Sequence, residues 1–264
     1  MSTLSGLISA GGGGGALPQI ALTQSQTWVP PQDGNICIHV IGAGGAGDTS
    51  NSTHYSGGAG GYCKKNSLAV TTSGSYTVVV GVGGPRNTAG AAPSSGGNST
   101  VAGTGLSSTL TANGGSASGS GQGAGGSASN GDVNNTGGAG IDQGGGGAVG
   151  VYGTGNAGTS NRVAGQSDAA ADGIGLSGFG HITGGNAGSF LYFGDDDGAM
   201  SGPENGGPLS GGGAASSTAL YNTVVGGNGG IGAGGGSAKN AASANYAISG
   251  AGGDGLVLIQ YLPS

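Results

Sequence analysis

The stretch Ile36-Cys37-Ile38-His39-Val40-Ile41-Gly42-Ala43-Gly44-Gly45-Ala46-Gly47 (ICIHVIGAGGAG) joins two kinds of sequence without a break. Its first half places apolar residues with a period of two, which predicts a β-strand over 36–41. Its second half matches G-x-G-x-x-G, the pattern that opens a dinucleotide-binding fold. That fold also needs a helix after the glycines and an acidic residue about 20 positions further on. The next segment has no helical period and carries Lys64 and Lys65 near the place of the acid, so we reject a nucleotide site.

Composition excludes several classes of protein. The 264 residues include 71 glycines, only 6% are charged, and the formal net charge is −6. Nucleic-acid binding needs clustered Lys and Arg, and the five basic residues do not provide a cluster. No apolar run approaches the roughly 18 residues of a membrane span. The opening MSTLSGLISAGGGGG lacks the basic region and the long apolar stretch of a secretory signal.

Two cysteines and three histidines are the soft metal ligands of the chain. We favour buried thiols at Cys37 and Cys63 over a single disulfide bridge. The histidines are scattered and do not complete a four-ligand zinc site. His39 alternates with the apolar face of its strand, and we interpret it as a structural neighbour.

Short β-strands account for the bulky residues. They are predicted at 27–29, 36–41, 62–63 with 67–70, 76–82, 99–101, 108–112 and 255–262. This spacing predicts an all-β protein with a small β-sandwich or barrel framework and little or no α-helix. The C-terminal strand is expected to complete a sheet that begins near residue 27. Four aromatic residues are predicted to have structural roles in this framework: Trp28, Tyr62, Tyr76 and Tyr261.

The glycine-rich middle of the chain must be either disordered or very densely packed. Each glycine loses roughly 0.5–1 kcal/mol more on folding than alanine would. Extended threefold helices of the polyproline-II type can offset this loss, because they pack closely where no Cβ intervenes. We favour an ordered bundle of this kind over a flexible tract, because isolated apolar residues interrupt the glycines. Collagen is excluded since glycine does not recur strictly at every third position.

Several ordered features carry a family resemblance. They are Trp28-Val29-Pro30, Gly42–Gly45, Gly57–Tyr62, Ser75–Gly84, Gly96–Thr100 and Gly252–Tyr261. Together they span residues 22–261, and the chain resembles the glycine-rich domain of bacteriophage tail-fibre and tail-tip proteins. It is similar in style to the tip adhesins of T-even-like phages, in which stacked polyglycine helices carry recognition loops. The resemblance implies a β framework from which glycine-rich loops extend.

The resulting division of the chain has four parts. We predict a flexible virion-docking leader at 1–17, a β framework with the first glycine-rich loops at 18–113, a polyglycine-II bundle at 114–250, and a closing strand at 251–264. A chain so poor in bulky side chains buries little apolar area alone, so a homotrimer is expected. The expected location is the virion tail, after assembly in the host cytoplasm, with other tail proteins as partners.

One aromatic and acidic island lies in the middle region. All three phenylalanines fall between 179 and 193, and three adjacent acids follow. The candidate receptor-contact residues are Phe190, Tyr192, Phe193, Asp195, Asp196 and Asp197. Aromatic residues often anchor recognition surfaces, but we slightly favour the interpretation that the island plugs a gap between subunits or sheets.

No catalytic set, metal site or cofactor is predicted. The spacing of Asp195, Asp197 and Glu204 fits part of a calcium loop, but the flanking helices are absent. The sequence predicts a non-enzymatic protein, and the resemblance implies a structural component of a phage tail. The alternatives are a receptor-binding adhesin that recognises a host glycan or outer-membrane protein, and a glycine-rich fibre of a cell surface.

Overall fold

The computed structural model describes residues 7–8, 19–50, 55–88, 91–119, 121–141, 145–147, 149, 153–158, 215–217, 223–240 and 247–263. Within these residues the chain forms β-strands and no helix, as predicted. The strands are β1 (Leu7–Ile8), β2 (Gln19–Leu22), β3 (Gln26–Trp28), β4 (Gly34–Ile41), β5 (Thr49–Ser50), β6 (Tyr62–Val70), β7 (Tyr76–Val79), β8 (Ser99–Gly103), β9 (Leu110–Ala112), β10 (Ala128–Ser129), β11 (Val133–Asn135), β12 (Ala215–Ser217), β13 (Val224–Val225), β14 (Ala238–Asn240), β15 (Ala247–Ile248) and β16 (Leu256–Tyr261).

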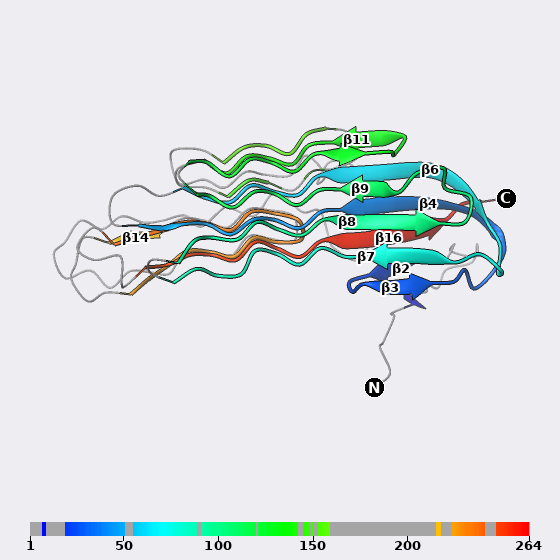
Figure 1. Cartoon of the computed structure of the whole chain (residues 1–264), viewed down its shortest axis with the longest axis horizontal. Helices are drawn as coiled ribbons and strands as arrows, with labels where there is room; N and C mark the ends of the chain where they lie inside the picture. Colours follow the sequence, from blue (N-terminus) through cyan, green and yellow to red (C-terminus); the bar gives the residue numbers. More distant parts are fainter. Residues whose placement is uncertain are drawn as a thin grey trace.

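Two sheets form a sandwich at one end of the molecule (Figure 1). One sheet has the order β1-β2-β16-β4-β6-β11 and the other β10-β9-β8-β7-β3. Their facing side chains form one buried core, in which Ile36, Ile38 and Val40 of β4 meet residues such as Val78 and Val101 of the other sheet. Both sheets are open in the described part of the chain, so the sandwich alternative holds and a closed barrel does not form.

The C-terminal strand forms as predicted, but it completes the sheet of β2 and β4 and not the sheet that holds residue 27. β16 lies between β2 and β4 and pairs antiparallel with both, so that Val257 is opposite Leu22 on one side and Val40 on the other. Chain segments more than 200 residues apart thus share one sheet. The sandwich cannot be completed until the end of the chain has been synthesised.

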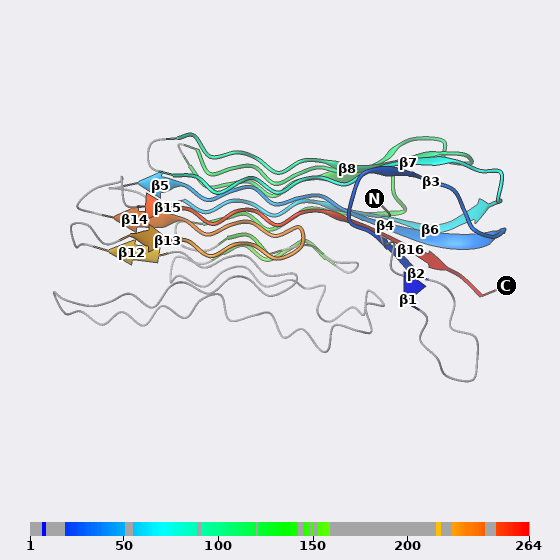
Figure 2. The ribbon, with the colours of Figure 1, turned by 90° about the horizontal axis from the view of Figure 1, so that it is seen from below.

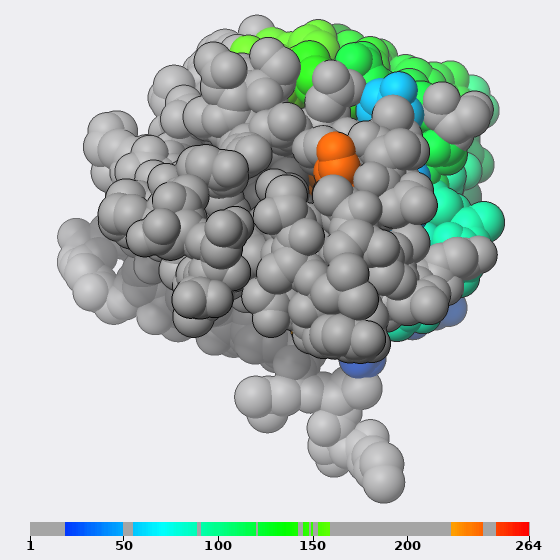
Figure 3. Space-filling view, turned by 90° about the vertical axis from the view of Figure 1, so that its left-hand side faces the viewer, coloured from blue at the N-terminus to red at the C-terminus, as the bar shows by residue number. Residues whose placement is uncertain are grey.

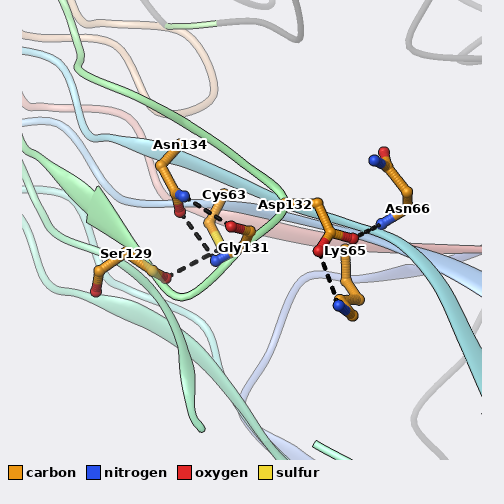
Figure 4. Close-up of polar contacts among 7 residues, drawn as sticks. All are labelled: Cys63, Lys65, Asn66, Ser129, Gly131, Asp132 and Asn134. Carbon is orange, nitrogen blue, oxygen red and sulfur yellow. Dashed lines mark hydrogen bonds and ion pairs between the residues drawn. The ribbon is translucent and has the colours of Figure 1, made fainter. Parts of the chain in front are cut away.

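The chain crosses between the two sheets at a tight turn (Figure 4). β10 belongs to one sheet and β11 to the other, with Asn130 in the left-handed region at φ 67° between them. The Asp132 carboxylate accepts hydrogen bonds from Lys65 Nζ and from the Asn66 amide, both at 2.8 Å. These two bonds lower the pKa of Asp132. They also fix β11 as the edge strand beside β6.

Beyond the sandwich the strands continue as extended glycine-rich segments, which we call threads (Figures 1 and 2). Each of eight described threads directly follows or precedes a sandwich strand. The threads are 42–47, 56–61, 80–84, 94–98, 113–118, 123–127, 136–140 and 250–255. They come from both sides of residue 114, so the bundle is built jointly by the first glycine-rich loops and the central region. The predicted domain boundaries themselves stay predictions.

Candidate functional site: the glycine bundle

Thread 42–47 lies inside the bundle and donates hydrogen bonds in three directions. From residue 42 to residue 47, the acceptors are the carbonyls of Gly61, Gly97, Gly253, Gly58, Ser94 and Gly250, at 2.8–3.2 Å. Every third N–H group therefore reaches the same neighbouring thread, and the partner's residue number falls by three each time. A period of three residues with bonds only to neighbouring threads is the arrangement expected of polyglycine II.

The carbonyl groups of the same thread bind three further segments. Those of Ala43, Gly44, Gly45 and Ala46 accept from the amides of Gly115, Gly84, Gly235 and Ser118, in that order. Thread 42–47 thus has six neighbours: it donates to three and accepts from three. Thread 56–61 is similar, since its amides from 57 to 61 donate to the carbonyls of Gly235, Ser116, Gly138, Gly232 and Asn113. The bundle therefore satisfies its backbone polar groups without a conventional sheet.

This close approach depends on the missing Cβ. A Cβ built on Gly44 would come closer than 3.0 Å to the carbonyl oxygen of Ala233, and one on Gly45 would come closer than 3.0 Å to that of Ser116. Ala43 and Ala46 are fully buried in the same thread, three residues apart. Their methyl groups therefore share the one side of the thread that has room for them. The order Gly-Ala-Gly-Gly-Ala-Gly follows the threefold period of the bundle.

The bundle has two different ends: the sandwich lies at one, and short strands lie at the other. β2 and β16 pair at the sandwich, whereas β5, β13, β14 and β15 lie at the opposite end (Figure 2). Threads 42–47, 80–84 and 113–118 run away from the sandwich, and the threads that follow each of them run back. Figure 3 views the molecule from this end and shows coloured residues from the early, middle and late parts of the chain.

The predicted contact residues Phe190, Tyr192, Phe193, Asp195, Asp196 and Asp197 lie outside the described residues. The four predicted structural aromatics are all buried. The rings of Trp28 and Tyr76 lie 5.4 Å apart at 46°, inside the sandwich. The Tyr261 hydroxyl donates to the Gln32 carbonyl at 3.0 Å. Trp28, Tyr76 and Tyr261 belong to the core between the two sheets, whereas Tyr62 packs on the opposite face of the β4 sheet, with Ile41 and Leu258.

A polar network lies on the face of β4 that points away from the second sheet. His39 is 3% exposed, with Nδ1 2.7 Å from the Tyr62 hydroxyl and Nε2 3.0 Å from Gln260 Oε1. Because an amide oxygen can only accept, this pairing assigns the proton to Nε2. Burial lowers the pKa of His39 to about 4, against the opposing effect of the Gln260 bond. The imidazole is therefore neutral and fully partnered, which agrees with its predicted structural role.

Cys37 adds a thiol to this network, with Sγ 3.3 Å from His39 Nε2. Cys37 and Cys63 are both buried free thiols, as the sequence favoured. Burial raises the pKa of both, that of Cys63 to about 11. In the described part of the chain, no three His, Cys, Asp or Glu side chains gather to hold a metal ion. No helix long and apolar enough to cross a membrane occurs there either.

The ordered glycines, the closing strand and the sandwich define a class of protein in which a β framework carries a polyglycine bundle. The model of the glycine-rich domain family matches residues 20–262 of this chain. The chain belongs to that family. Among curated proteins, none matches the sequence.

Some features of the bundle escaped the sequence analysis. The side-chain oxygens of Ser95, Asn98 and Asp254 accept hydrogen bonds from amides of neighbouring threads. Asn98 lies in the Gly-Gly-Asn-Ser-Thr motif that was singled out, but its role depends on a neighbour distant in sequence. Ser and Asn occur between most glycine runs, so composition alone could not distinguish these positions.

Proposed function

We propose that this chain is a structural, non-enzymatic component of a bacteriophage tail, either a tail-fibre or a tail-tip protein. The observation that carries the proposal is the division of the molecule into an end that holds β2 and β16 and an opposite end to which the threads run. Such a bundle would hold connecting loops at a fixed distance from the point of attachment. The ordered motifs from Trp28 to Tyr261, which resemble phage tail proteins, support the same assignment.

A backbone lattice suits this role for a physical reason. Each inner thread is fixed by hydrogen bonds at successive residues to as many as six neighbours, so bending it would break many bonds together. In this proposal the sandwich end binds other tail proteins, and the chain acts as a homotrimer assembled in the host cytoplasm.

Immunogold labelling of virions tests the assignment. An antibody raised against the recombinant chain, applied to particles of the phage that encodes it, should label the tail. Particles lacking the gene provide the control and should remain unlabelled. Absence of the chain from purified virions, or its presence only on a cell surface, would contradict the proposal and favour a cell-surface fibre.

The second candidate is a receptor-binding adhesin. Threads 42–47, 80–84 and 113–118 all run from the sandwich toward the same end of the molecule, and this favours it, because recognition loops commonly extend from rigid scaffolds. A phage carrying Phe190→Ala with Tyr192→Ala should then assemble normally but fail to adsorb to its host. Failure of assembly would instead support the role of the aromatic island as a plug.

A further inference from the structure

One outer face of the bundle, formed by threads 94–98 and 113–118, differs from the interior. Thread 113–118 obeys the threefold rule in two directions with backbone partners. Asn113 and Ser116 donate to the carbonyls of Ser127 and Ala124, and Gly115 and Ser118 donate to those of Ala43 and Ala46. Its third direction comprises the amides of Gly114 and Ala117, for which the described residues supply no backbone carbonyl.

Side chains of the adjacent thread 94–98 accept the hydrogen bonds of the amides that point in this third direction. The Gly114 amide donates to Asn98 Oδ1 at 2.9 Å, and the Ala117 amide donates to Ser95 Oγ at 3.0 Å. Both acceptors belong to exposed residues. They are three positions apart, as are the two donors, so the side chains follow the period of the lattice. They occupy the place that the carbonyls of another thread would otherwise fill.

Uncovered, these amides would form a regular row of donors on the surface. An open row of backbone groups is a template for pairing with another chain, as at the edge of a β-sheet. Threads 94–98 and 113–118 contain no charged residue that would oppose a close approach. The segment that best fits such a row is a glycine thread of a second copy, because it has the same period and no Cβ.

We propose that Ser95 and Asn98 end the lattice at this face and so prevent a second copy of the chain from extending the bundle. The same arrangement recurs elsewhere on the bundle. Asp254 Oδ1 accepts from the Gly83 amide at 2.7 Å, and Asn228 Oδ1 accepts from the Ala251 amide at 3.0 Å. Oligomers of the wild-type chain then form through other faces.

Sedimentation velocity of the full chain tests the proposal. The double variant Ser95→Ala with Asn98→Ala removes both acceptors and should self-associate beyond the wild-type state as concentration rises. Ser95→Thr keeps a hydroxyl acceptor and should sediment like the wild type. Ser107→Ala with Ser108→Ala removes two exposed hydroxyls outside the bundle and should also leave sedimentation unchanged.

Hydrogen exchange separates this role from simple stabilisation. In the double variant the amides of Gly114 and Ala117 should exchange roughly tenfold faster when dilute, as expected for a lost hydrogen bond. They should regain protection when the protein is concentrated. The proposal would be overturned if the double variant exchanged faster but sedimented like the wild type at every concentration. It would also be overturned if Ser95→Thr associated as strongly as the double variant. If the double variant fails to fold, Ser95→Ala replaces it. The single variant is then tested by its sedimentation and by the hydrogen exchange of the Ala117 amide, with the same expected results.

Discussion

Replacing Gly45 by alanine would place a methyl group at the centre of the bundle. The added Cβ would lie 2.5 Å from the carbonyl carbon of Ser116, whereas ordinary van der Waals contact begins at 3.4 Å. The nearest atoms are all backbone, so no flexible side chain can move aside. The Ser116 carbonyl oxygen lies closer still, so the two threads must separate.

Such a separation disturbs the hydrogen bonds around Gly45. Its amide donates to the Gly58 carbonyl at 2.9 Å, and the Gly58 amide donates to the Ser116 carbonyl at 3.0 Å. Overpacking a well-packed interior costs about 1–3 kcal/mol, and each lost hydrogen bond adds about 1 kcal/mol. Alanine restricts the unfolded chain and returns about 0.4–1 kcal/mol. We expect the free energy of unfolding to fall by about 2–4 kcal/mol on balance.

Gly119→Ala is the matched control. Gly119 is exposed, and a Cβ built there meets no atom within 4 Å. This variant should be stabilised by about 0.4–1 kcal/mol through the unfolded state alone. Urea unfolding of the two variants beside the wild type measures both effects. Changes of the same sign and similar size would refute the argument that backbone packing holds the bundle together.

The remaining predictions concern the sandwich. Tyr76→Phe should leave the free energy of unfolding unchanged or raise it, because the buried Tyr76 hydroxyl has no partner among the described residues. Tyr261→Phe should lower it by about 1 kcal/mol, because it removes the hydrogen bond to the Gln32 carbonyl. Urea unfolding compares the two variants. Because the pKa of His39 is lowered from 6.5 to about 4 in the folded chain, the unfolded chain binds a proton on His39 between these pH values and the folded chain does not. The stability it contributes above pH 6.5 should be lost as pH falls towards 4, by about 2 kcal/mol at pH 5, and His39→Asn should lack this component in pH-dependent unfolding. Cys37 and Cys63 should resist a thiol reagent in the native protein and both react in urea; rapid native labelling would contradict their burial.

The strands of the sandwich could be predicted because their side chains alternate. The period of two in Ile36, Ile38 and Val40 identified the face of β4 that packs against the second sheet, and these three residues lie in the core. The apolar C-terminal run was likewise recognised as a closing strand. By contrast, β11 is the polar segment Val133–Asn135 at a sheet edge, and nothing in its composition distinguishes it from a turn.

The end of β7 shows where sequence reasoning meets its limit. The apolar run predicts a strand over 76–82, but pairing ends at Val79. The chain stays extended and its hydrogen bonds change: the Gly81 amide donates to Ser99 Oγ, and the Gly84 amide donates to the Gly44 carbonyl. A Cβ on Gly81 would come closer than 3.0 Å to the Gly97 carbonyl oxygen. Propensity predicts extension equally well for both states, so only the neighbouring threads decide which state forms.

The continuity between strands and threads explains how so many glycines become ordered. A glycine thread has no side chain to select its neighbours and no internal hydrogen bonds, so an isolated thread would remain unfolded. The sandwich fixes one end of each of the eight threads through side-chain packing, as Val40 does two residues before Gly42. It thereby sets which threads are adjacent. It also sets the direction in which the first amide of each thread points, and the period of three residues fixes the directions of the amides that follow. Specificity thus comes from the apolar core, while the glycine backbone propagates that order to the far end.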